Sequence, residues 1–552
     1  GDLIGCMCAV TGKTVIEGDV EVSEAVDYAR FYTTAMKKFA ALDDIEIKPK
    51  GTILVISPWN FPCAIPVGGI VAGLAGGNTV ILKPATVAAP VAWMFAKAFW
   101  DAGVPKEALQ VIITNREALK VLTTAPAIKH IILTGGTDTA QNIARANPVT
   151  PLSAETGGKN VIILTASGDR DHAIMNIVAS AFGNAGQKCS ACSLLLVERS
   201  VYEDKNFQSK LKDAATSLKV GSVWNPGNIV GPMITNKNDK LLQAFNLEPG
   251  ESWLVPPHFI DHREYILAPT VKWGVKPESF SFRTELFGPL LSVACIENLE
   301  EGIKLVNSLD YGLTSGLQSL DEEEQKLWKN SVIAGNLYIN RGITGAIVNR
   351  QPFGGMKLSA FGGGIKAGGP NYCTCFVEIT DKPDSQTDYI DSYFDACEEE
   401  FMDPRDVNKL YGEQNVFRYL PLKSMILRLF PEDTNREVNM ISYASELCRT
   451  PLTISFDPSD DRTAALTQYG WPLRKESLED FLKVMPDYER VRTCSPNIPK
   501  CMYERAAETN MYIVAAPPMK QGRIELIRYF KEQSISFEYH RYGSISEVPP
   551  YE

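Results

Sequence analysis

Three polar residues, well separated along the chain, could together perform chemistry on a carbonyl carbon. Cys189 lies in Gly186-Gln187-Lys188-Cys189-Ser190-Ala191 and could attack such a carbon if its thiolate is stabilised. Glu155 precedes a Gly-Gly pair and could activate the water that releases an acyl product. Asn60 lies between two prolines that stiffen its loop, so its amide could donate to a developing oxyanion.

Each of these residues also has an ordinary structural interpretation. An isolated cysteine is more often an inert core residue, Glu155 could be a surface carboxylate at the entry to a strand, and Asn60 could simply form a turn. The spacing of Cys189 and Cys192 would also suit zinc or a thioredoxin-like redox pair. None of the five histidines completes a ligand set, so we predict no metal site and expect Cys192 to be a small core residue.

Composition restricts the class of protein. A chain of 552 residues is too long for one hydrophobic core, so two to four domains are expected. The net charge of −11 argues against a nucleic-acid partner. Twelve scattered cysteines fit a reducing compartment, which we take as the cytoplasm. The longest charge-free stretch, Gly51–Leu82, is interrupted by prolines and Gly-Gly pairs, so no transmembrane segment is predicted.

The elements that must position the three residues alternate between strand and helix. This alternation predicts a doubly wound α/β domain with a parallel sheet, followed by a second α/β unit from Asn160 that carries Cys189. Glycines crowd Gly354–Pro370, which we interpret as loop, and the acidic Asp381–Asp406 as a connector or solvated helix. The expected elements of the first unit are a helix over 21–41, strands over 51–56, 79–82, 109–113 and 128–133, and helices over 66–74, 88–102, 117–123 and 139–146.

The segment Thr134-Gly135-Gly136-Thr137 follows one of these strands and opens a helix. Its glycines would let the backbone approach a pyrophosphate at a helix N-terminus. The pattern is not GxGxxG, so by itself it is a weak indication of a dinucleotide site.

The motifs around Cys189, Glu155 and Asn60 together resemble those of the aldehyde dehydrogenase superfamily, over about residues 1–380. The resemblance implies an α/β aldehyde dehydrogenase fold, with a Rossmann-like cofactor domain and an α/β catalytic domain. It implies that Cys189 is the nucleophile, Glu155 the general base for thioester hydrolysis and Asn60 an oxyanion donor. The cofactor would be NAD, with NADP possible, because Thr86, Val87 and Ala88 replace the usual ribose-binding carboxylate. The cofactor-binding positions implied are Ser57, Trp59, Lys83, Gly135, Gly136, Glu285 and Phe287.

Two further segments narrow the resemblance to the branch that oxidises L-glutamate γ-semialdehyde. These are Gln187–Ser193 and Thr344–Gly355, the latter followed by Lys366-Ala367-Gly368-Gly369-Pro370. In that branch a serine after the nucleophile and the amides of a glycine-led loop hold the substrate carboxylate. The substrate-binding positions implied here are Ser190, Gly345, Ala346 and Phe353.

The tail resembles the C-terminal region of bifunctional proline utilization A proteins, which also carry a proline dehydrogenase. We therefore expect the sequence to be the C-terminal part of a longer protein, with a proline dehydrogenase domain as partner and a homo-oligomer formed through a flap near Pro370–Thr380. The alternatives are a dehydrogenase for another short semialdehyde, or a degenerate assembly module. The predicted domains are a cofactor domain at 1–157, a catalytic domain at 158–355, a flap and acidic connector at 356–411 and a non-catalytic α/β domain at 412–552.

Overall fold

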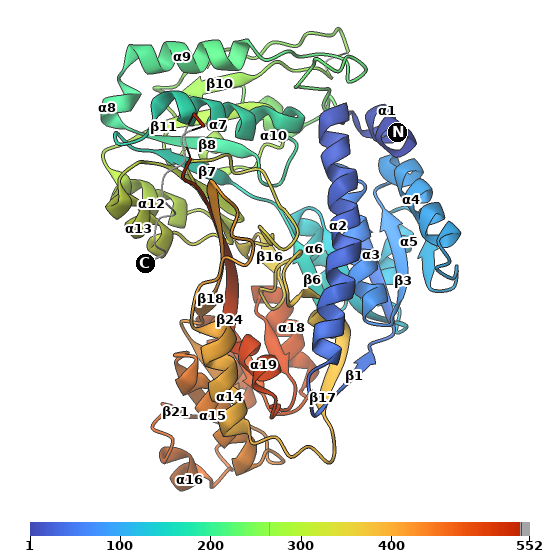
Figure 1. The fold of residues 1–552 in the computed structure, drawn as a ribbon. Coiled ribbons are helices and arrows are strands. Elements are labelled where there is room, and N and C mark those ends of the chain that lie inside the picture. Colours follow the sequence, from blue (N-terminus) through green and yellow to red (C-terminus); the bar gives the residue numbers. More distant parts are fainter. Residues whose placement is uncertain (264, 541, 544–552) are drawn as a thin grey trace.

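The computed structural model describes residues 1–263, 265–540 and 542–543 and contains three α/β units (Figure 1). Arg541 and residues 544–552, which belong to the predicted C-terminal domain, lie outside the described residues. Within the described ranges, none of the helices combines the length and the apolar character that a membrane span requires.

The first unit is built on a six-stranded sheet in the order β16-β6-β5-β2-β3-β4. All its strands are parallel except β16, which runs antiparallel to β6. The apolar run Ile53–Ile56 is buried, as expected for a strand covered on both faces. The elements are β2 Thr52–Ser57, α3 Ala64–Ala75, β3 Thr79–Pro84, α4 Ala89–Asp101, β4 Leu109–Val111, α5 Arg116–Thr124, β5 Ile128–Thr134, α6 Thr137–Ala146, β6 Leu152–Glu155 and β16 Ala360–Phe361.

Two N-terminal helices, α1 (Asp2–Thr11) and α2 (Val15–Ala40), pack against this unit. The predicted helix over 21–41 thus begins earlier, at Val15. Tyr28 and Tyr32 are buried on the face of α2 that meets α3. A Cβ at Gly68 would lie 3.3 Å from the Tyr28 ring, so glycine in α3 lets the two helices approach closely.

The second unit contains a nine-stranded sheet in the order β18-β24-β14-β13-β7-β8-β11-β10-β9. Only the two edge strands, β18 and β9, run antiparallel to their neighbours. The strands are β7 Asn160–Leu164, β8 Cys192–Glu198, β9 Ser252–Val255, β10 Thr270–Trp273, β11 Leu290–Ile296, β13 Thr314–Gln318, β14 Asn336–Ile339, β18 Glu413–Pro421 and β24 Phe530–Glu538. The helices are α7 Arg170–Phe182, α8 Arg199–Tyr202, α9 Lys205–Thr216, α10 Asp239–Gln243, α11 Phe280–Arg283, α12 Leu299–Asn307 and α13 Glu322–Ser331.

Strands β18 and β24 come from the region that the sequence assigned to a separate C-terminal domain. In the structure β24 pairs with β14 through Asn336–Ile339, and β18 pairs with β24. They cover the backbone donors and acceptors that β14 would otherwise expose at the sheet edge. The expected boundary at residue 412 therefore divides a single sheet, and Figure 1 shows both strands running from the lower unit into it.

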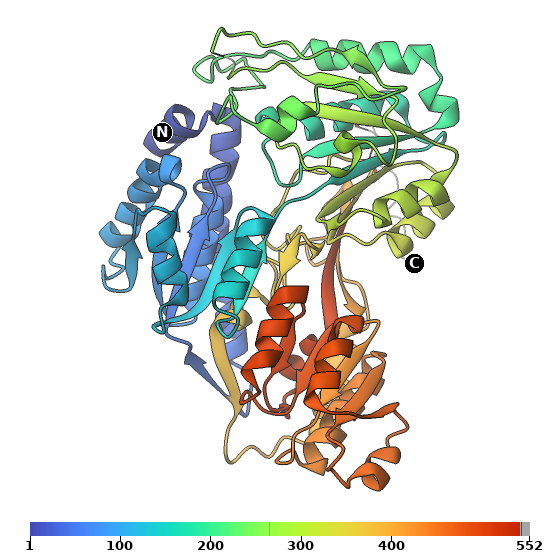
Figure 2. The same cartoon turned by 180° about the vertical axis from the view of Figure 1, so that it is seen from behind.

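The third unit has a parallel sheet in the order β21-β20-β19-β22-β23. Seen from behind (Figure 2), its helix α18 lies beside α6 of the first unit. Its elements are β19 Met425–Arg428, α15 Asn435–Leu447, β20 Leu452–Phe456, α16 Thr463–Thr467, β21 Leu473–Lys475, α17 Leu478–Val484, β22 Arg490–Thr493, α18 Lys500–Thr509, β23 Ile513–Ala515 and α19 Gly522–Glu525.

The acidic segment before this unit is neither a simple connector nor a fully solvated helix. Helix α14 (Tyr389–Ala396) and the π-helical turn Cys397–Phe401 bury Tyr393, Cys397 and Phe401 in the core of the third unit. These residues recur at four-residue steps among the acidic ones, which gives the segment one apolar face.

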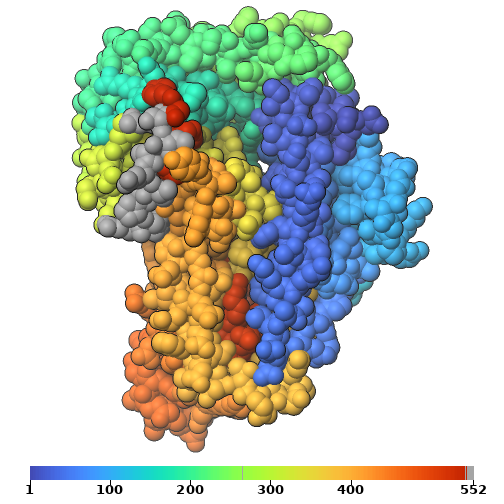
Figure 3. Space-filling view, viewed as in Figure 1, coloured from blue at the N-terminus to red at the C-terminus, as the bar shows by residue number. Residues whose placement is uncertain are grey.

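The glycine-rich segment 354–370 also contains short strands. Strand β15 (Met356–Lys357) pairs with β12 (Tyr311–Gly312), and β16 places Ala360 opposite Glu155. Further on, β17 (Val377–Asp381) pairs with β1 (Ile45–Pro49). The segment interpreted from sequence as loop is thus held by backbone pairing with β12 and with β6. The space-filling view shows it between α2 and the C-terminal part of the chain (Figure 3).

Candidate active site

Cys189 lies after a tight turn that joins α7 to β8. Asn184 and Ala185 adopt φ values of 51° and 54°, and Gly186 a φ of 68°. A Cβ at Gly186 would lie 2.3 Å from the Gly288 carbonyl oxygen, so only glycine fits. This turn directs the chain so that the Cys189 sulfur faces a pocket between the first two units.

Glu155 ends β6 and reaches the same pocket. The Gly355 amide donates a hydrogen bond of 2.9 Å to its Oε2. Burial raises the pKa of Glu155 above the ordinary glutamate range, although the Lys366 ammonium and the Gly355 amide oppose this effect. A carboxyl with a raised pKa can exchange a proton at a pH closer to neutrality.

Asn60 follows β2 and contacts the chain that leads to Cys189. Its Nδ2 donates a hydrogen bond to the Gln187 carbonyl oxygen at 3.0 Å. The main-chain carbonyl oxygen of Asn60 accepts a hydrogen bond from Lys13 Nζ at 2.8 Å. The side chain is 6% exposed. The Asn60 amide is thus fixed beside the segment that leads to Cys189, although Asn60 is not among the residues that line the pocket around Cys189, and its oxyanion role stays a prediction.

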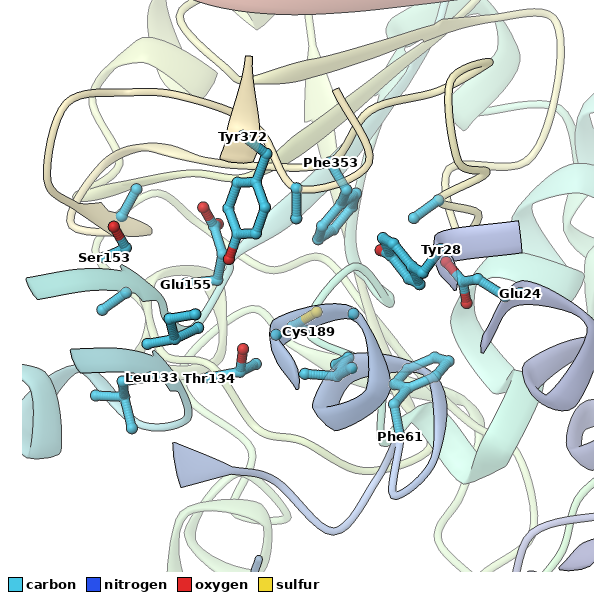
Figure 4. Close-up of a pocket in the computed structure, with 18 of the residues that line it drawn as sticks. Glu24, Tyr28, Phe61, Leu133, Thr134, Ser153, Glu155, Cys189, Phe353 and Tyr372 are labelled. Carbon is cyan, nitrogen blue, oxygen red and sulfur yellow. The ribbon is translucent and has the colours of Figure 1, made fainter. Parts of the chain in front are cut away.

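One pocket of about 170 Å³ contains Cys189 and Glu155. Figure 4 shows the Cys189 sulfur between two sides, with Glu155 and Tyr372 on one and Phe353, Tyr28 and Phe61 on the other. The carbonyl carbon of a bound aldehyde could therefore contact the thiol while its chain lies among the aromatic rings.

The predicted substrate-binding residues line the same pocket. Ser190 is adjacent to Cys189, and the Tyr338 hydroxyl holds the carbonyl oxygen of Gly345 at 2.8 Å. In the part of the chain that the structure describes, the amides of Gly345 and Ala346 donate no hydrogen bond. One hydroxyl and two amide groups are therefore available for an anionic group of a ligand.

Helix α2 contributes charged residues that the sequence interpretation missed. Glu17, Glu21 and Glu24 line the pocket together with Lys188. Glu17 pairs with Lys188 at 2.7 Å, and Glu21 pairs with buried Lys13 at 2.7 Å. Burial, together with the Glu21 carboxylate, raises the pKa of Glu24 to about 8. The signal was present, because Glu24 lies four residues before Tyr28 on the helix face already recognised by its periodicity.

The predicted cofactor residues gather at the carboxyl edge of the first sheet. Ser57, Lys83 and Gly135 lie at or just after the ends of β2, β3 and β5. The Ser57 hydroxyl is buried, and it has no hydrogen-bond partner among the residues that the structure describes. Gly136 caps α6, and a Cβ there would meet nothing closer than 4.0 Å. An open helix N-terminus beside an unpaired hydroxyl suits a dinucleotide at this edge.

Three further predicted cofactor residues, Trp59, Glu285 and Phe287, contact each other or the segment that follows Glu155. The rings of Trp59 and Phe287 meet edge to face with centroids 5.8 Å apart. Glu285 Oε1 accepts a hydrogen bond from the Gly158 amide at 2.8 Å. A Cβ at Gly157 would lie 2.4 Å from Glu285 Oε2, so this carboxylate requires glycine at that position.

Replacing Gly157 with alanine is expected to displace Glu285 and raise the KM for NAD by about ten-fold, the scale of one lost charge-assisted hydrogen bond. The added methyl group overlaps the carboxylate, while Cys189 and Glu155 keep their own contacts. Steady-state kinetics and direct titration of NAD would measure the effect. Alanine at Gly5, where nothing lies within 4 Å of a Cβ and φ is not left-handed, controls for the added methyl group alone.

The Cys189 thiol is not ionised by its surroundings. Burial raises its pKa to about 12, and the carboxylates of Glu285 and Glu155 act in the same direction against the amides of Ser190 and Cys189. Attack on a carbonyl therefore requires a proton acceptor, and Glu155 faces the same pocket.

The rate of aldehyde oxidation is expected to rise with pH well above the ordinary glutamate range of about pH 4–5. Glu155 can accept a proton only when ionised, and its raised pKa moves that ionisation to higher pH. Rates of acylation and deacylation measured from pH 5 to 10 would test this. A deacylation rate already constant from pH 5 upward would contradict it.

Of the other cysteines, all of which the structure describes, Cys375 also lines this pocket. Cys192 is 1% exposed on β8, and its Sγ contacts the Leu194 carbonyl oxygen at 3.4 Å. All twelve cysteines are free thiols. Among the described residues, one group, Asp433, Glu437 and Cys494, could hold a metal ion. Its two carboxylates already have structural contacts at the start of α15.

Together the sheet edge, the cysteine turn and the buried glutamate define an aldehyde dehydrogenase, and the chain belongs to the aldehyde dehydrogenase family, whose model matches residues 1–381. A 1-pyrroline-5-carboxylate dehydrogenase of Geobacillus kaustophilus is 35% identical over 382 residues, covering 65% of this chain and 73% of the relative.

Solved structures extend the similarity. Proline utilization A of Corynebacterium freiburgense superposes with a TM-score of 0.87 at 36% identity, covering 98% of this chain and 55% of that chain. A Thermus 1-pyrroline-5-carboxylate dehydrogenase with bound NAD gives a TM-score of 0.64 at 32% identity, covering 68% of this chain and 77% of that one. The chain thus spans about half the length of the first protein, and its similarity to it includes the third α/β unit.

Proposed function

We propose that the chain oxidises L-glutamate γ-semialdehyde to L-glutamate with NAD as oxidant, through a thioester on Cys189. One observation carries the proposal: a single pocket joins Cys189 and Glu155 to the carboxylate donors Ser190, Gly345 and Ala346. The similarity to 1-pyrroline-5-carboxylate dehydrogenases supports the same substrate, because the semialdehyde forms when 1-pyrroline-5-carboxylate is hydrolysed.

The chain's own residues account for each requirement of the reaction. Ser190 and the two loop amides hold the α-carboxylate, and Phe353 packs against the carbon chain. Cys189 loses its proton to Glu155 and attacks the aldehyde, while Asn60 and the Cys189 amide stabilise the oxyanion. NAD, bound at the sheet edge by Ser57, Lys83, Gly135, Gly136, Trp59, Glu285 and Phe287, supplies the two-electron oxidant. Glu155 passes the Cys189 proton to solvent and then takes a proton from the water that attacks the thioester, which releases glutamate and regenerates the Cys189 thiolate.

The acidic side of the pocket suits the substrate's α-amino group. Glu17 and Glu24 line the space beside Tyr28 and Phe61, and Lys188 pairs with Glu17 there. Although burial acts to raise the pKa of Glu17, the Lys188 ammonium brings it below its ordinary value. An ionised Glu17 beside the carboxylate donors would favour a substrate that carries both an ammonium and a carboxylate group.

Reduction of NAD and NADP with three aldehydes tests this function. L-Glutamate γ-semialdehyde carries both charged groups, 5-oxopentanoate lacks the amine and 4-aminobutanal lacks the carboxylate. We expect kcat/KM to fall by about ten-fold or more for each missing group, because one buried charge-assisted contact is lost each time. The same assay with Ser190→Ala should show a loss for the two carboxylate-bearing aldehydes only.

The outcomes separate the possible functions. A preference for 5-oxopentanoate would indicate another semialdehyde as substrate. No reduction of either cofactor with any of the three would contradict the proposed dehydrogenase activity. A higher kcat/KM with NADP than with NAD would correct the cofactor and identify Thr86–Ala88 as permissive for a 2′-phosphate.

We also propose that the chain works beside a proline dehydrogenase domain, because the protein it matches over 98% of its length is a proline utilization A.

Free thiols at all twelve cysteines favour a reducing compartment such as the cytoplasm. Homo-oligomer formation through 370–380 stays a prediction. Light scattering of the purified chain would test it.

A further inference from the structure

Lys366 is a buried cation with no carboxylate at ion-pair distance among the described residues. It is 1% exposed, and its Nζ donates to Asn336 Oδ1 at 2.8 Å and to the Gly354 carbonyl oxygen at 2.5 Å. A Cβ at Gly335 would lie 2.9 Å from this Nζ and 1.8 Å from the Gly354 oxygen, so the site requires glycine there. Burying an ammonium group is costly, so its retention calls for an explanation.

The contacts of Lys366 lead directly to Glu155. Gly354 precedes Gly355, whose amide holds Glu155 Oε2 at 2.9 Å. A Cβ at Gly354 would lie 3.1 Å from Glu155 Oε1 and 3.2 Å from Lys366 Cγ, so the carboxylate and the lysine chain approach the same side of that residue. Asn336 also anchors this segment, because its Oδ1 accepts a hydrogen bond from the Gly354 amide at 3.3 Å.

The C-terminal strand β24 fixes the other end of Lys366. Glu532 Oε2 accepts from the Lys366 amide at 2.6 Å, and its Oε1 accepts from Asn371 Nδ2 at 2.7 Å. Glu532 is 3% exposed. Asn371 also donates to the Tyr419 hydroxyl of β18 at 2.8 Å. The segment that carries Lys366 is therefore clamped to the two strands that the C-terminal part adds to the catalytic sheet.

We propose that Lys366 is the positioning residue for the general base Glu155, and that Glu532 of β24 holds Lys366 in place. Through Gly354 and Gly355 the lysine fixes the segment whose amide orients the carboxylate, and its positive charge favours the ionised form of Glu155. The C-terminal part of the chain thereby acts on thioester hydrolysis although it supplies no group that touches the substrate. This inference rests on the role of Glu155 in the proposed function.

The charges around the pair set the direction of the effect. Glu155 faces the thiol of Cys189, the phenols of Tyr28 and Tyr372, and the ammonium of Lys366. Burial lowers the pKa of Lys366, while the Glu155 and Glu532 carboxylates oppose this. Without the ammonium, the carboxylate of Glu155 loses its one nearby cation. Its ionisation, and with it deacylation, should therefore move to higher pH.

The test is pre-steady-state NADH formation by the full chain carrying Lys366→Met, with L-glutamate γ-semialdehyde and NAD from pH 6 to 10. We expect a burst near one NADH per site, followed by turnover slowed about ten- to hundred-fold at pH 7, a part of what general base catalysis contributes. The deficit should shrink as pH rises. Glu532→Gln, which retains one acceptor oxygen, should show the same pattern with a smaller loss.

Two results would overturn the proposal. One is deacylation by both variants at the wild-type rate with an unchanged pH profile. The other is an equal loss of burst and turnover at every pH, which would indicate a purely structural role. Glu538→Gln on the same strand, whose carboxylate pairs with His540, should behave as wild type. If the wild-type chain forms no NADH at all, the proposed function fails instead, so the two failures are distinct.

Discussion

The Cys189→Ala variant is expected to lose steady aldehyde oxidation by about a thousand-fold or more while it still binds NAD. The Cys189 sulfur lies between Glu155 and the aromatic side of the pocket (Figure 4), and it belongs to the residue that precedes the predicted carboxylate donor Ser190, whereas Cys375, the other lining cysteine among the described residues, lies on the segment after Tyr372. Removing the sulfur removes the atom that carries the acyl group. The predicted NAD contacts on the first sheet's carboxyl edge are unaffected.

Rapid-mixing kinetics and NAD titration by fluorescence would measure these two properties separately. Cys192→Ala is the matched control, because the Cys192 thiol on β8 is buried in the protein core. This variant is expected to keep turnover within about two-fold of wild type. Comparable losses in both variants would favour a redox pair over a nucleophile. Steady turnover by Cys189→Ala would reject the assignment of Cys189.

The Glu155→Gln variant is expected to form the thioester and then stall. Glutamine keeps an oxygen for the Gly355 amide, so the segment 354–355 should hold its position, but glutamine cannot accept a proton from water. General base catalysis contributes about 10²- to 10⁴-fold, so deacylation should slow by that factor. If Glu155 also takes the Cys189 proton, acylation will slow too, by an amount that rises at lower pH.

Intact-mass analysis after rapid quenching would detect the trapped acyl-enzyme, and its amount should match the NADH burst. Glu378→Gln, an exposed carboxylate on β17, controls for the loss of one negative charge. Free glutamate released at the wild-type rate, with no acyl-enzyme detected, would exclude Glu155 as the base and return it to the role of a structural carboxylate.

Local sequence patterns predicted the fold class and the candidate catalytic residues. The buried apolar runs near Ile53 and Ile131 predicted a parallel α/β unit, because both faces of such strands are covered. The motifs at Cys189 and Glu155 indicated an aldehyde dehydrogenase, and the family match confirms it. Apart from α2, which begins at Val15 rather than at residue 21, helix and strand bounds in the first unit agree within a few residues, since their caps and glycines are local signals.

What only the tertiary structure decided depends on contacts between distant segments. No periodicity reveals that β24 joins β14 across nearly two hundred residues, because strand pairing is chosen by which sheet edge is open. The same holds for Glu17 and Glu24, which become pocket residues only when α2 packs on α3. Lys366 appeared in the sequence as part of a loop motif. Lys366 is buried beside Glu155, and its amide donates a hydrogen bond to Glu532, only because the C-terminal strand β24 joins the catalytic sheet.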